Sequence, residues 1–405
     1  MRKLGWALLL GLAFSIPWEY SLDLGAPFGN ISRVLGILLV LAMGPAVLQT
    51  GRIRNLTALH WLVLSLVIWF ALTYFWSIDP KSTLDHARGS VQEVMIFWFV
   101  SELIDTPEQL RDLFRCYVAG CCVLAVLTVA NFASPDAAGQ IRFAAPGQDP
   151  NDVARFLDLG FPLGACLLHP SSRWTDNLLA AAYLPLGFMG VLLTASRAGL
   201  IAAVVALAGC AWVLVRTRSH AVTVLGLSLL AVLGSFWLAV PQETFDRLLT
   251  IPEQLTEGDL NLRLNIWAAG WQAVVHAPFA GSGAGTFSSA AGLGPLDTAH
   301  NTALAMTVEG GMSALLLASG IAAMAAIFVV TLRGTLRVAI GTASLVWVVT
   351  SLVATVQENR QTWLLLGVVA VAHRLTAEQP GELARTFSER ALPRRRRPAA
   401  ALATE

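Results

Sequence analysis

The chain has 405 residues, of which 56% are hydrophobic and 13% are charged, and its formal net charge is +1. Ordinary soluble domains carry about 25% charged residues. This composition therefore excludes an ordinary soluble domain and indicates that lipid surrounds most of the chain. The small net charge comes without a basic helical face, so nucleic-acid binding is not expected. The five cysteines lie in apolar stretches without metal-ligand spacing, which predicts buried free thiols.

Apolar stretches near the length of about 20 residues that a membrane crossing requires follow one another along the chain. They predict an all-α polytopic membrane protein with about twelve transmembrane helices. The first stretch resembles a signal peptide, but Pro17, Trp18 and Glu19 follow it instead of small residues, which predicts a retained helix. The expected spans are 4–20, 31–48, 56–76, 91–104, 113–133, 154–169, 177–195, 199–215, 221–240, 302–332, 338–357 and 361–374.

The distribution of basic residues predicts the orientation of these spans. With a cytoplasmic N-terminus, 18 of the 27 Lys and Arg residues fall on the cytoplasmic side, as the positive-inside rule requires. The expected organisation is spans one to nine in 1–240, a large periplasmic loop in 241–301, spans ten to twelve in 302–374, and a basic, disordered cytoplasmic tail in 375–405.

The long loop between the ninth and tenth spans is the main functional candidate, because long loops in compact proteins are usually functional. Its segment 259–275 has apolar residues near helical spacing and predicts a helix along the membrane surface. The glycine-rich run 281–286 lacks the Lys-Ser/Thr ending of a phosphate-binding loop and follows no strand, so we expect a tight turn after Pro278. Gly310 and Gly311 predict either a break inside the long span 302–332 or a re-entrant start.

Three arginines on the outer side are candidates for binding an anion. Arg197 lies in a very short turn between two apolar helices, where a charge is costly unless it meets an anion or reaches the interface. Arg263 lies on the predicted surface helix, and Arg247 lies earlier in the same loop. Guanidinium groups bind phosphate oxygens bidentately. The sequence leaves open whether each of them binds a ligand or is a solvated or interfacial charge, and for Arg247 the solvated charge is the simpler interpretation.

His300 is the candidate general base, because only His86, His276 and His300 of the seven histidines fall on the outer side. Its unperturbed pKa near 6.5 suits proton transfer at neutral pH. Asn301 follows it, and Glu309 comes two turns later inside an apolar run, where a carboxylate either serves a site or forms a structural ion pair. A structural role remains open for each of these residues.

The order of short motifs along the chain resembles the O-antigen ligase family, within the superfamily that also holds O-antigen polymerases. None of the motifs is specific alone, but their order on this topology is. They are Trp76-Ser77-Ile78-Asp79-Pro80, Asp149-Pro150-Asn151-Asp152-Val153-Ala154, Ser196-Arg197-Ala198-Gly199, Arg263 with Trp267, Pro278 with Gly281, Gly283, Gly285 and Phe287, and His300-Asn301 with Glu309-Gly310.

The resemblance implies a membrane-embedded glycosyltransferase of the all-helical GT-C type that is metal-independent and needs no cofactor. Family ligases act in the bacterial inner membrane. At the periplasmic face they move a polysaccharide from undecaprenyl diphosphate to lipid A–core. At the matching positions, Arg197 and Arg263 would hold the donor diphosphate and His300 would be the base. The expected reaction is an inverting transfer in which Arg247, Asn301 and Glu309 also contact substrate.

Three other functions remain open at this point. A polymerase of the same superfamily would use the same donor but extend another undecaprenyl-linked chain, and a protein-directed oligosaccharyltransferase is a further variant. A transporter or flippase of lipid-linked sugars also commonly has twelve spans. Such transporters usually have internal repeats and a binding site near the midplane of the membrane. This sequence has no matched halves and gathers its polar candidates at one face, which favours interfacial chemistry.

Overall fold

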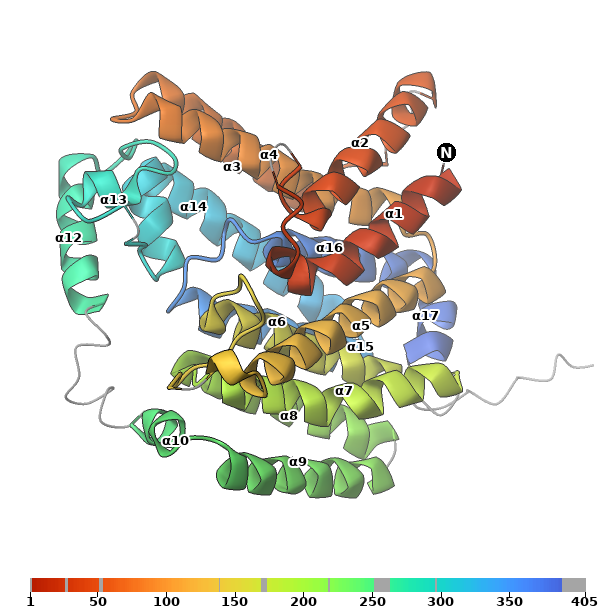
Figure 1. The fold of residues 1–405 in the computed structure, drawn as a ribbon. Coiled ribbons are helices and arrows are strands. Elements are labelled where there is room, and N and C mark those ends of the chain that lie inside the picture. Colours follow the sequence, from red (N-terminus) through yellow and green to blue (C-terminus); the bar gives the residue numbers. More distant parts are fainter. Residues whose placement is uncertain are drawn as a thin grey trace, which may run out of the picture.

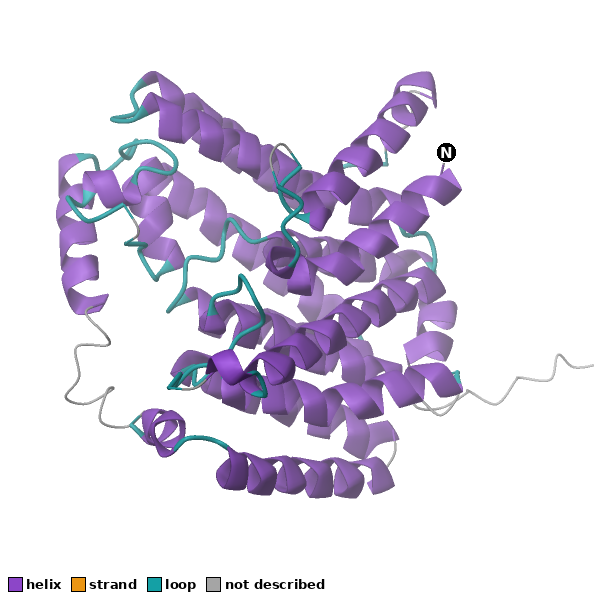
Figure 2. Cartoon of the chain, in the orientation of Figure 1, coloured by secondary structure: helices purple, strands orange, loops and turns teal. Residues whose placement is uncertain are grey.

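The computed structural model describes residues 2–25, 28–50, 54–137, 139–168, 173–217, 219–250, 263–295 and 297–387. Within these ranges the regular structure is helical, and the single β feature is an isolated bridge between Asp23 and Asn30 (Figure 2). This confirms the all-α prediction for the part of the chain that the structure describes.

In the part of the chain that the structure describes, twelve long helices correspond to the twelve expected spans, and shorter helices connect or follow them. The long helices are α1 (Arg2–Ser15), α2 (Ile31–Thr50), α3 (Ala58–Leu72), α4 (Pro80–Leu103), α5 (Pro107–Phe132), α6 (Pro150–Leu167), α7 (Trp174–Leu193), α8 (Arg197–Thr217), α9 (Ser219–Ala239), α14 (Thr302–Thr331), α15 (Gly334–Ser351) and α16 (Arg360–Glu378). The short ones are η1 (Ile16–Ser21), η2 (Thr73–Phe75), η3 (Pro135–Ala137), α10 (Gln242–Leu249), α12 (Arg263–His276), α13 (Phe287–Ala290) and α17 (Pro380–Phe387).

Six helices of the described chain are long and apolar enough to cross a membrane by length and composition: α3 with η2, α5, α7, α8, α14 and α15. The protein is therefore a multi-pass membrane protein. The exact number of twelve crossings stays a prediction.

The helices form one bundle whose two ends differ (Figure 1). The start of α1 and the short α17 lie at one end, on the right of the view, and α10, α12 and α13 lie at the opposite end. Helix α6 is the centre of the bundle, because every residue from Val153 to Leu167 is buried and α5, α7, α8 and α15 all pack against it. The N-terminus of α6 points toward the end of the bundle that carries α10, α12 and α13.

Two glycine features of the sequence behave as predicted. Gly311 has φ +69° and ψ −171°, which interrupts α14 in its first third. The run after Pro278 forms a tight turn in which Gly281 and Gly283 have positive φ angles. Backbone hydrogen bonds of 2.9 Å from Ser282 to Val308 and from Gly283 to Glu309 fix this turn on α14.

Helix α4 begins earlier than hydropathy predicts. The expected span 91–104 is the second half of a helix that starts at Pro80, and Asp79 caps its N-terminus by accepting a 3.1 Å hydrogen bond from the amide of Ser82. Its first half carries polar residues, so a hydropathy argument does not assign this half to a membrane span. These residues face a cavity that is described below, so the early start of α4 matters for function.

The prediction of disorder from residue 375 onward is wrong for 375–387. Helix α16 continues to Glu378, and α17 follows with Leu383 and Phe387 buried. The ring of Phe387 packs on Phe114 of α5 with 6.0 Å between centroids. The apolar pattern of this short helix therefore holds it against the bundle. The remainder of the predicted tail, 388–405, lies outside the described residues, as do residues 259–262 of the predicted surface helix.

Candidate active site

Three arginines meet at the turn between α7 and α8. The turn is tight, since Ala195 has φ +46°. Arg142 Nε donates a 3.1 Å hydrogen bond to the carbonyl of Thr194, and Arg247 Nε donates one of 3.3 Å to the carbonyl of Ala195. Arg197 then donates from Nε to the carbonyl of Arg247 at 3.0 Å. The backbone carbonyls of this turn and of α10 thus accept hydrogen bonds from three guanidinium groups that are distant from one another in the sequence.

The N-terminus of α6 supports the same cluster. Asp149 caps the helix by accepting a 2.7 Å hydrogen bond from the amide of Asn151, and Pro150 occupies the first turn, where its missing N–H costs nothing. The side-chain oxygen of Asn151 accepts from Arg142 Nη2 at 2.8 Å and from Ser196 Oγ at 2.9 Å. Asn151 therefore fixes Arg142 beside the turn that carries Arg197.

Arg263 contributes a fourth guanidinium from the first residue of α12. This helix packs on α14, and Trp267 Nε1 donates a 3.0 Å hydrogen bond to the carbonyl of Ala299. The contact ties α12 to the residue before His300. Burial lowers the pKa of Arg263, and the neighbouring carboxylate of Asp149 acts in the opposite direction.

The four guanidiniums are close enough to disfavour one another's charge. Burial is the largest cause of the lowered pKa of Arg142, and the charges of Arg247, Arg263 and Arg197 lower it further. Asp149 opposes this effect. Such a group of like charges is costly in the free protein and favours an anion that several guanidinium forks can bind together.

His300 lies beside this cluster, immediately before α14, in a backbone conformation with φ +45°. Asn301 caps α14 by accepting a 2.9 Å hydrogen bond from the amide of Leu304, and its Nδ2 donates to the carbonyl of Leu352 at 3.2 Å. The pKa of His300 is lowered from 6.5, first by burial and then by the charge of Arg263. The imidazole is therefore neutral at pH 7 and able to accept a proton.

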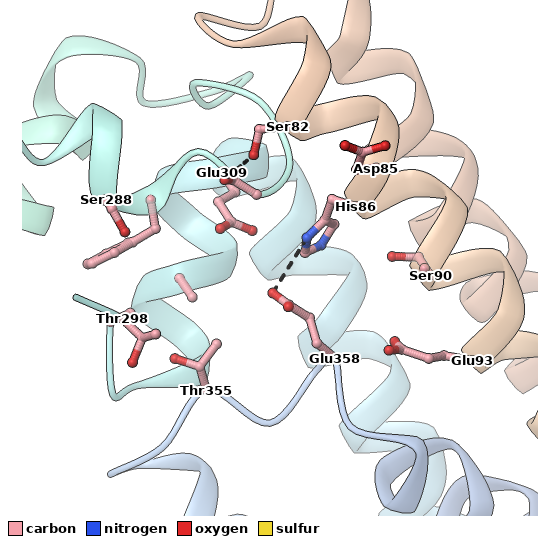
Figure 3. A pocket seen from close by; sticks show the side chains of 15 residues that line it. Ser82, Asp85, His86, Ser90, Glu93, Ser288, Thr298, Glu309, Thr355 and Glu358 are labelled. Carbon is pink, nitrogen blue, oxygen red and sulfur yellow. Dashed lines mark hydrogen bonds and ion pairs between the residues drawn. The ribbon is translucent and has the colours of Figure 1, made fainter. Parts of the chain in front are cut away.

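A cavity of about 400 Å³ lies next to His300, between α4, residues 285–288 and 298–299, α14 and the segment before α16 (Figure 3). The side chains of His86, Glu309 and Glu358 point toward one another in it. His86 Nδ1 and Glu358 Oε1 are 3.5 Å apart. One ligand atom from each of these three residues lies within 4.8 Å of the other two, so they form a group that could hold a metal ion.

The sequence-based candidates divide between these two places. Arg197, Arg247, Arg263 and His300 lie together, with Asn301 directly beside His300. Glu309 lies in the cavity with His86 and Glu358, and no contact among the described residues joins it to the arginine cluster.

Several residues of the two places were not selected from the sequence. Arg142 is not among the sequence-based candidates, and Asp149 and Asn151 entered only as part of a motif that resembles the O-antigen ligase family. Their signal was the Asp-Pro-Asn-Asp run before an apolar helix, because that run caps a helix and presents polar side chains at its start. His86 and Glu358 had no comparable local signal.

The described residues define an all-helical, multi-pass membrane protein with an arginine cluster and a polar cavity that both adjoin His300. Residues 182–319 match the family model described as O-antigen ligase. This match supports assigning the chain to the O-antigen ligase family and confirms the resemblance read from its motifs. No curated protein matches the chain. The matched segment includes Arg197, Arg247, Arg263, His300 and Glu309.

The match supports the O-antigen ligase and polymerase superfamily. It implies an enzyme of the glycosyltransferase type that acts on lipid-linked glycans within a membrane. Arg142, Asp149, His86 and Glu358 lie outside the matched segment, so their roles rest on the geometry of this chain alone.

Proposed function

We propose that the protein transfers an O-antigen polysaccharide from undecaprenyl diphosphate to lipid A–core at the periplasmic face of a bacterial inner membrane, with both termini cytoplasmic. The observation that carries the proposal is the convergence of four guanidinium groups beside a neutral His300, in a chain that matches the O-antigen ligase family model. A lipid diphosphate offers several oxygens for bidentate contacts. The arginines would therefore hold the donor by its leaving group.

The proposed chemistry is a single inverting displacement. The acceptor hydroxyl attacks the anomeric carbon, the bond from that carbon to the diphosphate oxygen breaks, and both electrons leave with the diphosphate. His300 takes the proton of the attacking hydroxyl. Arg197 and Arg263, with Arg142 and Arg247 beside them, stabilise the charge that develops on the leaving oxygen, as fixed charges do in other electrostatically organised sites.

The reaction is proposed without a metal or nucleotide, because the diphosphate bond of the donor supplies the energy and the arginines supply positive charge. Asn301 supports the base through its position at the start of α14. Glu309 lies on the acceptor side, where it would bind a sugar hydroxyl. These roles are proposals for individual side chains, and each can be tested by substitution.

Reconstitution of the full-length protein tests the function directly. Purified protein in lipid is incubated with an undecaprenyl-diphosphate-linked glycan and lipid A–core in a chelator, and products are resolved by gel and mass spectrometry. We expect glycan on lipid A–core, with loss of transfer in His300→Ala. His276→Ala is the matched control, because His276 is an exposed histidine of α12 whose loss should leave transfer unchanged.

Two other products would lead to other conclusions. Longer undecaprenyl-linked chains with unmodified lipid A–core would identify a polymerase. Movement of intact donor across the bilayer without any transfer would favour a flippase. Equal activity of His300→Ala and wild type would exclude His300 as the base.

A further inference from the structure

The cavity beside His300 has a composition that suits a sugar. Its lining offers four carboxylates, one imidazole and five hydroxyl groups, with a single aromatic ring. Its volume of about 400 Å³ lies within the usual range of about 300–1,000 Å³ for small-molecule sites. The polar lining residues are Ser82, Asp85, His86, Ser90, Glu93, Ser288, Thr298, Glu309, Thr355 and Glu358.

Glu309 is the best indication that the cavity binds a ligand. Its side chain is aimed into the cavity (Figure 3), and only 3% of the residue is exposed. The amides of Gly285 and Phe287 hydrogen-bond to the carboxylate, yet Oε2 has no hydrogen-bond partner in the described part of the chain. A buried carboxylate oxygen without a donor is costly. A hydroxyl or amine group of a ligand would supply the missing donor.

The glycine-rich turn after Pro278 builds this cavity. A Cβ at Gly281 would lie 2.4 Å from the carbonyl carbon and oxygen of Glu309, and a Cβ at Gly285 would lie 3.1 Å from His86 Cβ and 3.2 Å from His86 Nδ1. The turn can therefore pass between α14 and α4 only because these residues lack side chains. It brings Glu309 and His86 to the same cavity wall, which gives the motif a role that does not involve phosphate.

The cavity also adjoins the proposed base. Thr298 and Ala299 line it, and they directly precede His300. Thr298 Oγ1 lies 3.4 Å from His300 Nδ1. A sugar in the cavity would thus have the imidazole at its edge, with the arginine cluster beyond the imidazole.

We propose that this cavity is the acceptor-sugar subsite and that it accepts a neutral or amine-bearing sugar and rejects a phosphorylated one. The inference rests on the proposed function. The carboxylates of Asp85 and Glu358 in the lining would repel an anionic substituent, and like charges that are brought together in a binding site cost several kcal/mol. The same carboxylates accept hydrogen bonds from hydroxyl or ammonium groups. Charge therefore separates the donor diphosphate from the acceptor sugar.

The test is a binding measurement on the full-length protein that does not require turnover. Three soluble core oligosaccharides are compared, identical except that the terminal sugar carries a hydroxyl, an amine or a phosphate at one position. We expect the phosphorylated ligand to bind at least tenfold more weakly than the other two. Glu358→Gln, at an exposed side chain that tolerates substitution, should weaken binding of the hydroxyl form about tenfold and should reduce the discrimination against phosphate.

Two controls make the result decisive. Glu243→Gln changes an exposed glutamate of α10 and should leave all three affinities unchanged. Binding of an undecaprenyl diphosphate donor should be equal in Glu358→Gln and wild type. Equal binding of the three oligosaccharides by the wild type would overturn the inference. So would a requirement for Mn²⁺ that His86→Ala removes, because the cluster would then be a metal site.

Transfer measured in parallel separates this inference from the proposed function. Selective oligosaccharide binding that is sensitive to Glu358→Gln, without transfer to lipid A–core, would support the sugar subsite and contradict the ligase. Transfer with no selectivity at this cavity would support the ligase and refute the subsite.

Discussion

Replacing Arg197 with lysine tests whether its guanidinium binds the donor or only anchors α10. The side chain donates from Nε to the carbonyl of Arg247 at 3.0 Å and from Nη2 to Thr250 Oγ1 at 2.8 Å. These two bonds fix the plane of the guanidinium at the turn between α7 and α8. Lysine keeps the positive charge but has a single nitrogen, so it cannot bind α10 and a phosphate in the same way.

The expected loss can be worked out from these contacts. A hydrogen bond to a charged group contributes about 1.5–3 kcal/mol and a neutral one about 1 kcal/mol. Both contacts that Arg197→Lys removes, one to phosphate and one that anchors α10, have the charged guanidinium as donor, so together they amount to about 3–6 kcal/mol. This predicts a loss of roughly 10²- to 10⁴-fold in kcat/KM. Thr250→Val removes the anchoring contact from Arg197 Nη2 and the 2.9 Å hydrogen bond from Thr250 Oγ1 to the carbonyl of Arg247, but no phosphate contact, so it should cost less than Arg197→Lys.

The assay is the initial rate of glycan transfer in proteoliposomes at limiting donor. Arg33→Lys, at an exposed arginine near the start of α2, is the control for the substitution itself and should leave the rate unchanged. If Arg197→Lys retained more than about a third of the wild-type kcat/KM, the bidentate contact would be refuted. If Arg197→Lys and Thr250→Val lost equal activity, Arg197 would act by anchoring α10 alone.

The pH dependence and the glycine turn give further predictions. Because burial and a neighbouring guanidinium lower the pKa of His300 from 6.5, the acid limb of kcat/KM should have its midpoint below pH 6.5. Asp149→Asn should lower that midpoint further, since Asp149 raises this pKa, and an upward shift would contradict the assignment. Below about pH 6.5 the unfolded chain binds a proton at His300 more tightly than the folded protein does. Acidification therefore destabilises the folded protein through this group, and His300→Ala should lessen that loss of thermal stability. Gly281→Ala should lower the melting temperature more than Gly292→Ala, because both glycines have positive φ but only a Cβ at 281 would meet Glu309, at 2.4 Å; equal shifts would show that the close approach is unimportant.

The long apolar helices could be predicted because hydropathy and length decide where a chain crosses lipid. The same argument failed for the first half of α4, where polar residues line a cavity inside the protein and do not meet lipid. The break at Gly311 could also be predicted, since only glycine adopts φ +69° without strain. The long apolar helices and the break at Gly311 depend on local sequence, so local sequence was sufficient to predict them.

The composition of the site could be predicted only in part. Arg197, Arg263 and His300 stand out because each lies at the edge of an apolar stretch. Arg142 does not, since its position depends on how the loop before α6 folds back. There the amide of Phe143 donates a 2.9 Å hydrogen bond to the carbonyl of Leu193 and the ring is buried. A tertiary contact of this kind has no signature in a single sequence.

The opposite charges on the two sides of His300 have a consequence for the proposed reaction. In the free enzyme, Arg263 helps to keep the imidazole neutral, which is the form that can accept a proton. A bound diphosphate would balance the guanidinium charge and so raise the proton affinity of the same imidazole, as nearby anions do. His300 would become a stronger base when the donor is in place, while the carboxylates of Asp149, Asp297 and Asp152 favour its protonated form. One set of fixed charges could therefore bind the leaving group and also couple the basicity of His300 to the presence of the donor.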